Sequence, residues 1–317
     1  MPRIVIPDDA PPVMARSAAY KTLLDREAVD YHDTLPAGEE RLIERIAGAA
    51  VVINIRSSTR FTETVFQQSP NLRLLSLWGT GTDNVDLAAA ARHGVTVTNT
   101  PGVSAFSIAE HALALMLAAA RRIPRVDAEI RQGHWPRGQA VQMHGKTLGI
   151  VGLGAVGRQF ARLGAGIGMR VIAWTMHPNP ALGFELVSLD ELLRSSDVVS
   201  LHLRLSSETR GFMGKSEIQK MKTSAILINT ARGAIVDEQA LLDALTSNRI
   251  AGAGLDVFEV EPLPPSHPLT RRENVELTPH SAGVTPEALE AGLQLSIDNV
   301  WNFLDGHPTN VVVNGAR

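Results

Sequence analysis

The stretch that decides the fold is TLGIVGLGAVGRQFARLGAGIGMRV, which runs from Thr147 to Val171. Its pattern predicts a buried β-strand, a glycine-rich turn, an α-helix and a second strand. In a turn with this G-x-G-x-x-G spacing, the first glycine makes the bend, the second lets the backbone approach a pyrophosphate, and the third lets the helix lie close to the strand. The N-terminus of the helix then faces the anion. The residues expected around the pyrophosphate are Gly152, Gly154, Ala155, Val156 and Gly157.

The whole chain has the composition of a globular protein that binds a small molecule. It has 317 residues, 44% of them apolar and 20% charged, and no cysteine, which excludes disulfides and a thiol nucleophile. The net charge of -3, with scattered basic residues, gives no sign of nucleic-acid binding. The longest apolar run, Ala112 to Ala120, is far shorter than the roughly 20 residues that span a bilayer. The N-terminus does not resemble a signal peptide. We expect a cytoplasmic protein without membrane or nucleic-acid partners.

Short β-rich segments alternate with helical patterns along the chain. Nearly every position in these segments is apolar, so helices must cover both faces of the sheet, as is typical of parallel sheets. This repetition predicts an α/β protein with two doubly wound, Rossmann-like parallel sheets. The expected strands are RIVI, AAVVINI, RLLSL and VTVT before residue 100, then TLGIVG, RVIAW, DVVSLHL, SAILINT and IAGAGLDVF.

Two helical segments interrupt this alternation. One runs from Val103 to about Arg131 and is rich in Ala and Leu. The other runs from Pro286 to about Asp305 and begins with the start signal Thr-Pro-Glu. We expect these helices to be the crossings between two domains, with a cleft between the domains. The first domain is then discontinuous, residues 1–100 plus 286–317, and holds the substrate. Residues 101–285 form the dinucleotide-binding domain.

Charged side chains follow the strands that come after the glycine turn. Arg232 lies in INTARG, Asp256 and Glu261 lie in GLDVFEVEP, and His280 lies in LTPHSAG. Ligands of an open parallel sheet bind beyond the carboxyl ends of its strands, so we expect these residues to converge near the glycine turn. Arg grips a carboxylate through its planar fork, and His exchanges a proton with a carbonyl oxygen. A neighbouring Glu stabilises the protonated imidazole. The set suits hydride transfer to a 2-oxo acid.

Together these motifs resemble those of the D-isomer-specific 2-hydroxyacid dehydrogenases. GLGAVG, NTARG, GLDVFEVEP and TPH occur in the order of that family, and WGTGTDNVD, NTPGVSAFSIAEHALALML and GHW extend the resemblance over almost the whole chain. The resemblance implies an NAD(P)-dependent enzyme acting on a small acid such as glyoxylate or hydroxypyruvate. It implies that Arg232 binds the substrate, that Glu261 and His280 form the acid-base pair, and that Asp256 contacts the nicotinamide. Thr230 and Ala231 are also expected at the cofactor.

The resemblance also implies where the substrate carboxylate lies and how the protein assembles. In the family this carboxylate meets backbone amides. The corresponding residues here are Ser57, Ser58 and Thr59, and Gly79, Thr80 and Gly81. Members of the family are usually homodimers, and the Ala-rich helix from Val103 offers a surface for such a contact.

Two other functions stay open. One is a cofactor-sensing binding protein, like the transcriptional corepressors that resemble the family, although we expect no long interaction tail after the last helix. The other is a phosphoglycerate dehydrogenase that lacks a regulatory domain. For that enzyme, Arg56 and Arg60 are the candidate phosphate ligands, but they do not by themselves prove a phosphate pocket.

The residues after the second strand of the dinucleotide site bear on the choice of cofactor. A carboxylate usually binds the adenosine ribose there, but this chain has VIAWTMHPNP, with Thr175 and His177. Without an acid, the repulsion that excludes a 2′-phosphate is gone. Arg204 stands where the family commonly has Pro, and an Arg suits a phosphate. NAD and NADP both stay open, and these residues favour NADP.

The remaining histidines give no sign of a metal site. His111 follows Glu110 within the long helical segment, and we expect it to have a packing role. The others have no acidic partners at metal-ligand spacing. They are His93, His134, His144 and His307.

Overall fold

The structure is a computed structural model that describes residues 3–315. The chain divides into two compact units, which we call unit 1 (Met1–Ser104 with Thr285–Arg317) and unit 2 (Ala105–Val284). Unit 1 is therefore discontinuous. The chain enters unit 2 at residue 105 and returns at residue 285, where the sequence analysis placed these crossings at residues 101 and 286.

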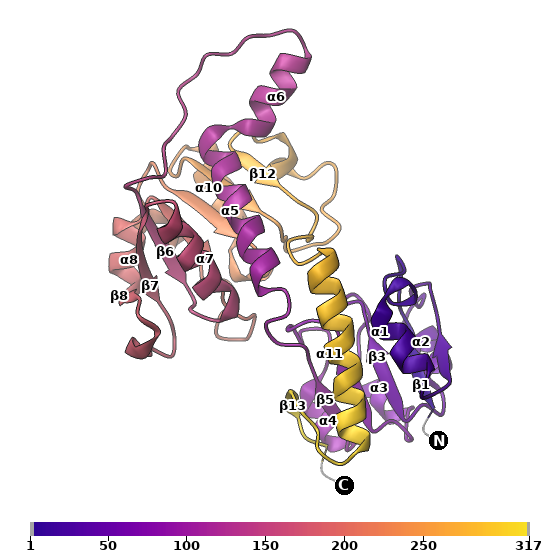
Figure 1. The fold of residues 1–317 in the computed structure, drawn as a ribbon. Helices are drawn as coiled ribbons and strands as arrows, with labels where there is room; N and C mark the ends of the chain where they lie inside the picture. Colours follow the sequence, from indigo (N-terminus) through magenta and orange to yellow (C-terminus); the bar gives the residue numbers. More distant parts are fainter. Residues whose placement is uncertain (1–2, 316–317) are drawn as a thin grey trace. The chain divides into compact units, whose positions relative to one another are not determined.

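Unit 1 is built on a mostly parallel sheet with the strand order β13-β5-β4-β3-β1-β2 (Figure 1). Only the pairing of β13 with β5 is antiparallel among the described strands. The strands are β1 (Ile4–Ile6), β2 (Val29–Tyr31), β3 (Val51–Asn54), β4 (Leu74–Leu77), β5 (Thr96–Thr98) and β13 (Val311–Val313). Strand order reverses between β1 and β3, and this switch point is where an open sheet of this kind binds ligands.

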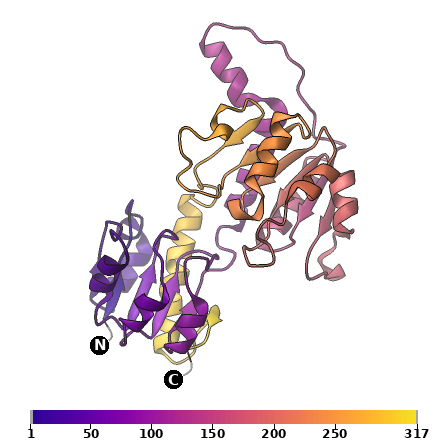
Figure 2. The same cartoon turned by 180° about the vertical axis from the view of Figure 1, so that it is seen from behind.

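Helices cover both faces of the unit 1 sheet. They are η1 (Met14–Arg16), α1 (Ala18–Leu24), α2 (Glu39–Ile46), α3 (Glu63–Gln67), α4 (Leu87–Arg92) and α11 (Pro286–Leu304). Helix α11 begins at the expected residue because Thr285 accepts a hydrogen bond from the amide of Ala288 and Pro286 occupies the first turn. Its side chains Leu293, Ile297 and Val300 belong to the same core as Ile4 of β1 and Ile53 of β3. Figures 1 and 2 show the helix lying along the unit 1 sheet.

Unit 2 contains a parallel sheet with the strand order β12-β11-β10-β9-β6-β7-β8. The strands are β6 (Thr147–Val151), β7 (Arg170–Trp174), β8 (Glu185–Leu186), β9 (Val198–Leu201), β10 (Ile226–Asn229), β11 (Gly252–Leu255) and β12 (Val275–Leu277). Four of them, β6, β9, β10 and β11, are buried along almost their whole length, as expected for strands covered on both faces. The order reverses between β6 and β9, next to the glycine turn. The expectation of two doubly wound, Rossmann-like sheets is confirmed.

The helices of unit 2 include two that the sequence analysis had merged. They are α5 (Ala105–Arg121), α6 (Ile123–Arg131), α7 (Ala155–Gly166), η2 (Pro180–Leu182), α8 (Leu189–Ser195), α9 (Lys215–Lys220), η3 (Gly233–Ile235), α10 (Glu238–Thr246) and η4 (Pro268–Arg271). The expected single helix over residues 103–131 is wrong, because Arg122 adopts left-handed φ 53° and ends α5. Pro124 lies in the first turn of α6, the helical position that tolerates proline.

Helix α5 packs one face into unit 2. Ala109, Ala112 and Met116 join a core that contains Phe160 of α7. Helix α6 differs, since none of its residues is buried, and in Figure 1 it extends with the following loop away from the rest of unit 2. No helix in residues 3–315 is long and apolar enough to cross a membrane.

Candidate active site

Three neighbouring strands of unit 2 bring the predicted residues to one edge of the sheet. Because β10, β11 and β12 are parallel and adjacent, their carboxyl ends lie side by side. Arg232 follows β10, Glu261 follows β11, and His280 follows β12. The glycine turn follows β6 at the same edge, because all pairings in this sheet are parallel.

His280 and Glu261 form an ion pair. The Nδ1 atom of His280 lies 2.7 Å from Oε2 of Glu261, and both side chains are about one-third exposed, 37% and 35%. The other carboxylate oxygen, Oε1, accepts a hydrogen bond from the amide of Phe258 at 3.0 Å. Burial alone would raise the pKa of Glu261, but the hydrogen bonds from His280 and Phe258 outweigh burial, and the charges of His280 and Arg232 act in the same direction. The pKa of Glu261 therefore lies below its usual value, and the carboxylate stays ionised beside the imidazole.

The loop that carries Arg232 packs against the loop that carries Glu261. A Cβ atom at Gly233 would collide with the backbone of Phe258 and Glu259, so only glycine permits this approach. The side-chain amide of Asn229 donates to the carbonyl of Arg232 at 2.9 Å. Since Arg232 also acts on the Glu261 carboxylate electrostatically, the structure brings Arg232, Glu261 and His280 together. Their roles in a reaction stay predictions.

The glycine turn has the geometry that a pyrophosphate needs. Gly152 has φ 103°, and a Cβ atom there would lie 2.7 Å from the carbonyl oxygen of His202. A Cβ atom at Gly157 would collide with the carbonyl of Gly152. Gly154, at the N-cap of α7, has nothing within 4 Å of its Cβ position, so its backbone faces open space. The first and third glycines are thus required by packing alone, and the second leaves room for a ligand at a helix N-terminus.

The residues expected to choose the cofactor follow β7. Thr175 is half-buried, and Met176 and His177 are exposed. Trp174, the last residue of β7, stacks on Phe212, with ring centroids 5.2 Å apart. The backbone of Arg204 accepts a hydrogen bond from Thr209 Oγ1 at 2.6 Å, and the residue is exposed. The residue types after β7 suit a dinucleotide, and no carboxylate among them opposes a 2′-phosphate.

The substrate residues expected in unit 1 follow β3 and β4. Ser57 and Ser58 are exposed beyond the end of β3, while Thr59 is buried. Next to them lies a cavity of about 340 Å³, whose lining includes Ser58, Arg60, Leu35 and Leu42. Thr80 is exposed after β4, and Gly79 and Gly81 are half-buried. The amide of Gly79 already donates to Thr100 Oγ1 at 2.7 Å, which argues against a role for that particular amide in holding a carboxylate.

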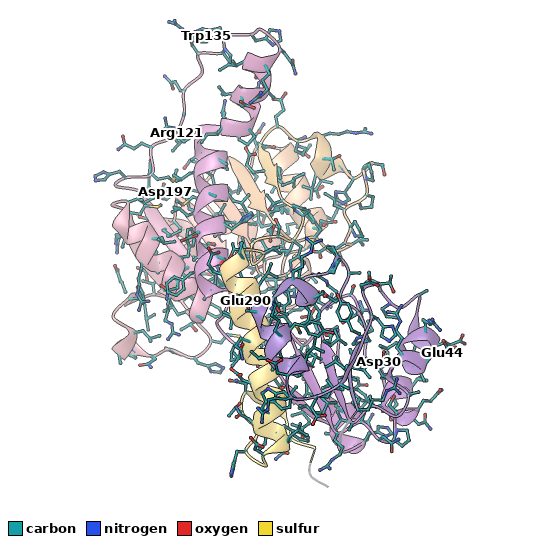
Figure 3. All side chains as sticks on the ribbon, turned by 45° about the vertical axis from the view of Figure 1, so that its right-hand side comes forward. Asp30, Glu44, Arg121, Trp135, Asp197 and Glu290 are labelled. Carbon is teal, nitrogen blue, oxygen red and sulfur yellow. The ribbon has the colours of Figure 1, made fainter. Side chains whose placement is uncertain are left out.

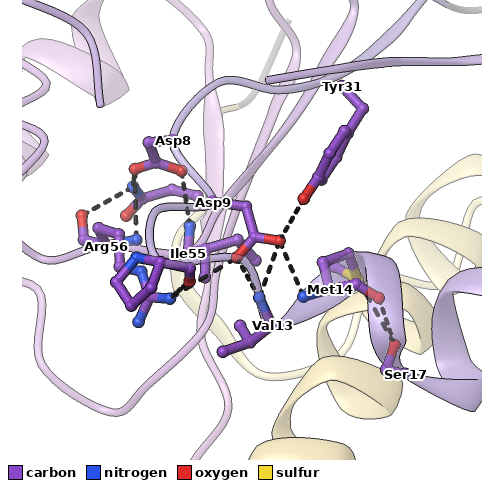
Figure 4. Close-up of polar contacts among 10 residues, drawn as sticks. Asp8, Asp9, Val13, Met14, Ser17, Tyr31, Ile55 and Arg56 are labelled. Atoms are coloured by element: carbon purple, nitrogen blue, oxygen red, sulfur yellow. Dashed lines mark hydrogen bonds and ion pairs between the residues drawn. The ribbon is translucent and has the colours of Figure 1, made fainter. Parts of the chain in front are cut away.

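Two buried aspartates after β1 hold the loop that carries Ser57 (Figure 4). Asp8 accepts hydrogen bonds from the amides of Ile55 at 3.0 Å and of Arg56 at 3.2 Å. Burial raises the pKa of Asp8, and these hydrogen bonds oppose the rise. Asp9 accepts from the amides of Val13 and Met14 and lies 3.7 Å from the guanidinium of Arg56, which also donates to the carbonyl of Pro11.

Sequence reasoning missed several residues that support loops within each of the two units. Asp8 and Asp9 follow the buried strand β1. Two consecutive acids in such a place indicate side chains that are buried with partners. His202 lies under the glycine turn, with Nε2 2.9 Å from Ser200 Oγ and its ring edge-on to Phe160. Burial lowers the pKa of His202 to about 3, so this imidazole is neutral. His111 is more than the packing residue expected, because its Nε2 atom lies 2.9 Å from Thr278 Oγ1.

This combination of fold and residues defines a class of protein. A parallel sheet with a glycine turn at its switch point, and an Arg, a Glu and a His at the same edge, is the arrangement of an oxidoreductase that binds a nicotinamide dinucleotide. Known proteins narrow the class. A sequence model described as "D-isomer specific 2-hydroxyacid dehydrogenase, NAD binding domain" matches residues 113–282.

Individual relatives agree with this match. The chain is 39% identical over 293 residues to a glyoxylate reductase of Korarchaeum cryptofilum, covering 89% of this chain and 88% of that protein. It is 40% identical over 282 residues to a D-3-phosphoglycerate dehydrogenase of Archaeoglobus fulgidus, covering 87% of this chain and 53% of that protein. The solved structure of an acyclic imino acid reductase in complex with NADPH and D-Arg has a TM-score of 0.91, 29% identity, and 98% and 100% coverage of the two chains.

The chain belongs to the D-isomer specific 2-hydroxyacid dehydrogenase family. The expectation of an oxidoreductase of this family that uses a nicotinamide cofactor is confirmed. The chain spans about half of the phosphoglycerate dehydrogenase and most of the glyoxylate reductase.

Proposed function

We propose that this protein transfers a hydride between a nicotinamide cofactor and C2 of a small 2-hydroxy or 2-oxo acid, such as glyoxylate or hydroxypyruvate. The observation that carries the proposal is the 2.7 Å contact between His280 Nδ1 and Glu261 Oε2, beside Arg232 and at the sheet edge that holds the glycine turn. An acid-base pair and a carboxylate-binding cation are the groups that reduction of a 2-oxo acid requires.

We propose an atom or side chain for each role. Because Nδ1 of His280 is occupied by Glu261, the proton that reaches the substrate oxygen comes from Nε2. The Glu261 carboxylate stabilises the imidazolium before this transfer. Arg232 grips the substrate carboxylate and the neighbouring carbonyl oxygen. The bound cofactor supplies or accepts the hydride at C2. In the oxidation direction, His280 takes the proton from the hydroxyl group.

The residues of unit 2 fit a dinucleotide. The open space at Gly154 and the free N-terminal turn of α7, with Ala155 and Val156, suit a pyrophosphate. Thr230, Ala231 and Asp256 follow β10 and β11 and are proposed to lie near the nicotinamide. Between the two cofactors we propose a preference for NADP, with Thr175, His177 and Arg204 near the 2′-phosphate. The NADPH in the related imino acid reductase supports this choice.

A small, unphosphorylated substrate is favoured over a phosphorylated one. Of the two candidate phosphate ligands, the Arg56 guanidinium lies against Asp9 and donates to the carbonyl of Pro11, and its side chain is only 18% exposed. Holding a phosphate would require Arg56 to leave these partners. We propose that the amides near Ser57, Ser58, Thr80 and Gly81 receive the substrate carboxylate.

We further propose that the protein is a homodimer and works in the cytoplasm. Helix α6 and its following loop expose large apolar side chains without a partner surface in their own unit. They are Ile123, Ile130 and Trp135, which are 56%, 46% and 73% exposed. Figure 3 labels Trp135 in the loop after α6. Exposed apolar surface of this kind marks a protein contact.

Purified protein tests the reaction with NADH and NADPH and a panel of 2-oxo acids that includes glyoxylate, hydroxypyruvate, pyruvate and 3-phosphohydroxypyruvate. We expect loss of nicotinamide absorbance with the unphosphorylated acids. His280→Ala should reduce turnover by about 100-fold to 10,000-fold while cofactor binding persists. Cofactor binding without turnover on any acid would instead support the cofactor-sensing alternative, and a preference for 3-phosphohydroxypyruvate would support the phosphoglycerate dehydrogenase.

The cofactor preference has its own test. Thr175→Asp places a carboxylate where an adenosine ribose would lie and should repel a 2′-phosphate. We expect the ratio of kcat/KM for NADPH to that for NADH to fall by about tenfold or more, equivalent to about 1.4 kcal/mol. An unchanged ratio would show that the end of β7 does not select the cofactor.

A further inference from the structure

Asp256 holds the loop that carries His280. Its side chain is fully buried. Its Oδ1 atom accepts from Thr278 Oγ1 at 2.6 Å and from the amide of Ser281 at 2.9 Å, and its Oδ2 atom accepts from the amide of Ala282 at 2.9 Å. Its backbone carbonyl accepts from the amide of His280 at 2.7 Å. One residue therefore fixes the chain on both sides of His280.

The loop needs this support because of its backbone conformation. His280 has φ 52°, in the left-handed region that residues with a Cβ atom avoid. Such a conformation persists only where the surrounding structure determines it. The hydrogen bonds to Asp256 hold His280 in this conformation. The Asp256 carboxylate in turn accepts a hydrogen bond from the Thr278 hydroxyl, which must point toward it.

The orientation of this hydroxyl identifies a further residue. Thr278 Oγ1 has one hydrogen, which it gives to the Asp256 carboxylate. Toward His111 Nε2, at 2.9 Å, the same oxygen can therefore only accept, so Nε2 of His111 carries a hydrogen. Nε2 also lies 3.6 Å from Asp256 Oδ1. The donors form one chain, from His111 to Thr278 to Asp256, and all three residues belong to unit 2.

His111 is itself held by a well-packed helix. Its neighbours on α5, Ala109 and Ala112, are fully buried, and the His111 side chain is 24% exposed. One turn later, Leu115 lies so close to β11 that a Cβ atom at Gly254 would be 2.9 Å from Leu115 Cβ. Because β11 leads directly into Asp256, α5 presents His111 to the hydrogen-bonded loop from a fixed position.

We propose that His111 is a positioning residue for His280. Its Nε2–H group orients the Thr278 hydroxyl toward Asp256, and the Asp256 carboxylate then holds His280 in the conformation that faces Glu261. This inference rests on the proposed function, since it takes His280 as the acid-base group. It differs from a packing role because it depends on a hydrogen-bond donor at one atom.

The test compares variants that keep the donor with variants that remove it. His111→Gln keeps an N–H donor near the position of Nε2, whereas His111→Leu fills similar space without one. Thr278→Ser keeps the hydroxyl, and Thr278→Val removes it at equal size. We expect His111→Leu and Thr278→Val to lower kcat about 10-fold to 100-fold, since a small misplacement of a catalytic group has effects of this size. The KM for the 2-oxo acid should change little. His111→Gln and Thr278→Ser should retain most of the wild-type kcat.

Amide hydrogen exchange provides a readout that does not depend on activity. In His111→Leu, the amides of His280, Ser281 and Ala282 should exchange faster than in the wild type, while those of β6 should not. Wild-type kcat and wild-type exchange in His111→Leu would overturn the proposal, as would equal losses in His111→Leu and His111→Gln. If His280→Ala were fully active, the proposed function would fail, but accelerated exchange in His111→Leu would still establish the hydrogen-bonded chain.

Discussion

The ion pair of His280 with Glu261, which we propose as the acid-base group, joins two short loops. The two residues lie 19 positions apart in the sequence but follow adjacent strands, so parallel pairing of β11 with β12 brings them within 2.7 Å. The lowered pKa of Glu261 keeps its carboxylate ionised below the usual value of 4.5. Glu261 therefore faces the His280 imidazole as an ionised carboxylate at neutral pH.

Replacing Glu261 by Gln should lower the activity at every pH at which the wild-type carboxylate is ionised. The pKa of Glu261 lies below its usual value, so the wild-type carboxylate carries its charge beside His280 throughout the neutral range, whereas the amide is neutral at every pH. We expect kcat/KM for 2-oxo acid reduction to fall about tenfold, equivalent to about 1.4 kcal/mol. Profiles measured from about pH 5 to pH 9 for both proteins check this. Superimposable profiles would show that Glu261 does not act on His280.

Replacing Arg232 by Lys tests whether the proposed substrate-binding residue needs the shape of a guanidinium group as well as its charge. Lysine keeps the charge but loses the planar fork that binds two oxygens. We expect kcat/KM for the 2-oxo acid to fall about 10-fold to 100-fold, with unchanged cofactor affinity, because charge-assisted hydrogen bonds contribute about 1.5–3 kcal/mol. Steady-state kinetics and a cofactor fluorescence titration give both values. A fully active Arg232→Lys would show that charge alone is sufficient.

Which single residues could be anticipated depended on their sequence context. Arg232, Glu261 and His280 each occur in a short motif directly after a strand, and the strand order places them together. Asp256 stands in the same context, but burial and three donors to its side chain were not visible in the sequence. Asp8 and His111 were missed because their partners lie 47 and 167 positions away, respectively.

At the scale of elements, the three glycines of the turn fall into two kinds. Two are required by packing, and we propose that the third leaves space for a ligand. Gly152 and Gly157 approach backbone atoms so closely that a side chain would collide, whereas Gly154 faces open space. A change at each position should therefore have a different effect, although all three belong to one motif.

Gly157→Ala and Gly154→Ala form a matched pair. In Gly157→Ala the new Cβ meets the carbonyl of Gly152, so we expect a loss of unfolding free energy of about 1–3 kcal/mol together with weaker cofactor binding. Gly154→Ala should keep the stability of the wild type yet weaken cofactor binding at least about tenfold, because the methyl group occupies the space of the pyrophosphate. Thermal unfolding and cofactor titration separate the two effects.

Gly166→Ala, in the last turn of α7, is the control. It meets nothing within 4 Å and should be neutral or stabilising by up to about 1 kcal/mol. Normal cofactor binding by Gly154→Ala would contradict the assignment of the pyrophosphate to this turn.

Long buried strands and capped helices were predictable, and short edge elements were not. The strands β2, β8, β12 and β13 lie at the edges of the two sheets and are only partly buried. The strands β1 and β5 are equally short but fully buried, and their position in the sequence was anticipated. The break between α5 and α6 depends on the left-handed backbone conformation of Arg122. An arginine in the sequence does not indicate this conformation. Pro124 was the available signal, since proline in a helical pattern marks a kink or a new start.

At the scale of the whole molecule, the division into two units followed from the sequence because the strand pattern stops at two long helical segments. The bounds of unit 2, residues 105–284, lie close to the expected 101–285. The dimer contact that we propose could not be located from composition. The proposal of helix α6 rests on its exposed apolar side chains.

The assembly can be tested on this surface. A double variant, Ile130→Asp with Trp135→Ser, removes apolar contacts from positions that are exposed within the unit, so its folding should be unaffected. We expect the wild type to sediment as a dimer of 34.1 kDa chains and the variant as a monomer at micromolar concentration. A wild-type monomer, or a variant that remains dimeric, would contradict a contact through α6.

The return of the chain to unit 1 has a consequence for its synthesis. Leu293, Ile297 and Val300 of α11 belong to the same core as Ile4 and Ile53, yet the ribosome makes them after all of unit 2. Unit 2 has its complete sheet by residue 284 and can fold as it emerges. Until α11 is made, η1 and α1 cover only part of one apolar face of the β1–β5 sheet. A nascent chain halted before α11 should therefore hold a folded unit 2 and a protease-sensitive, chaperone-binding unit 1.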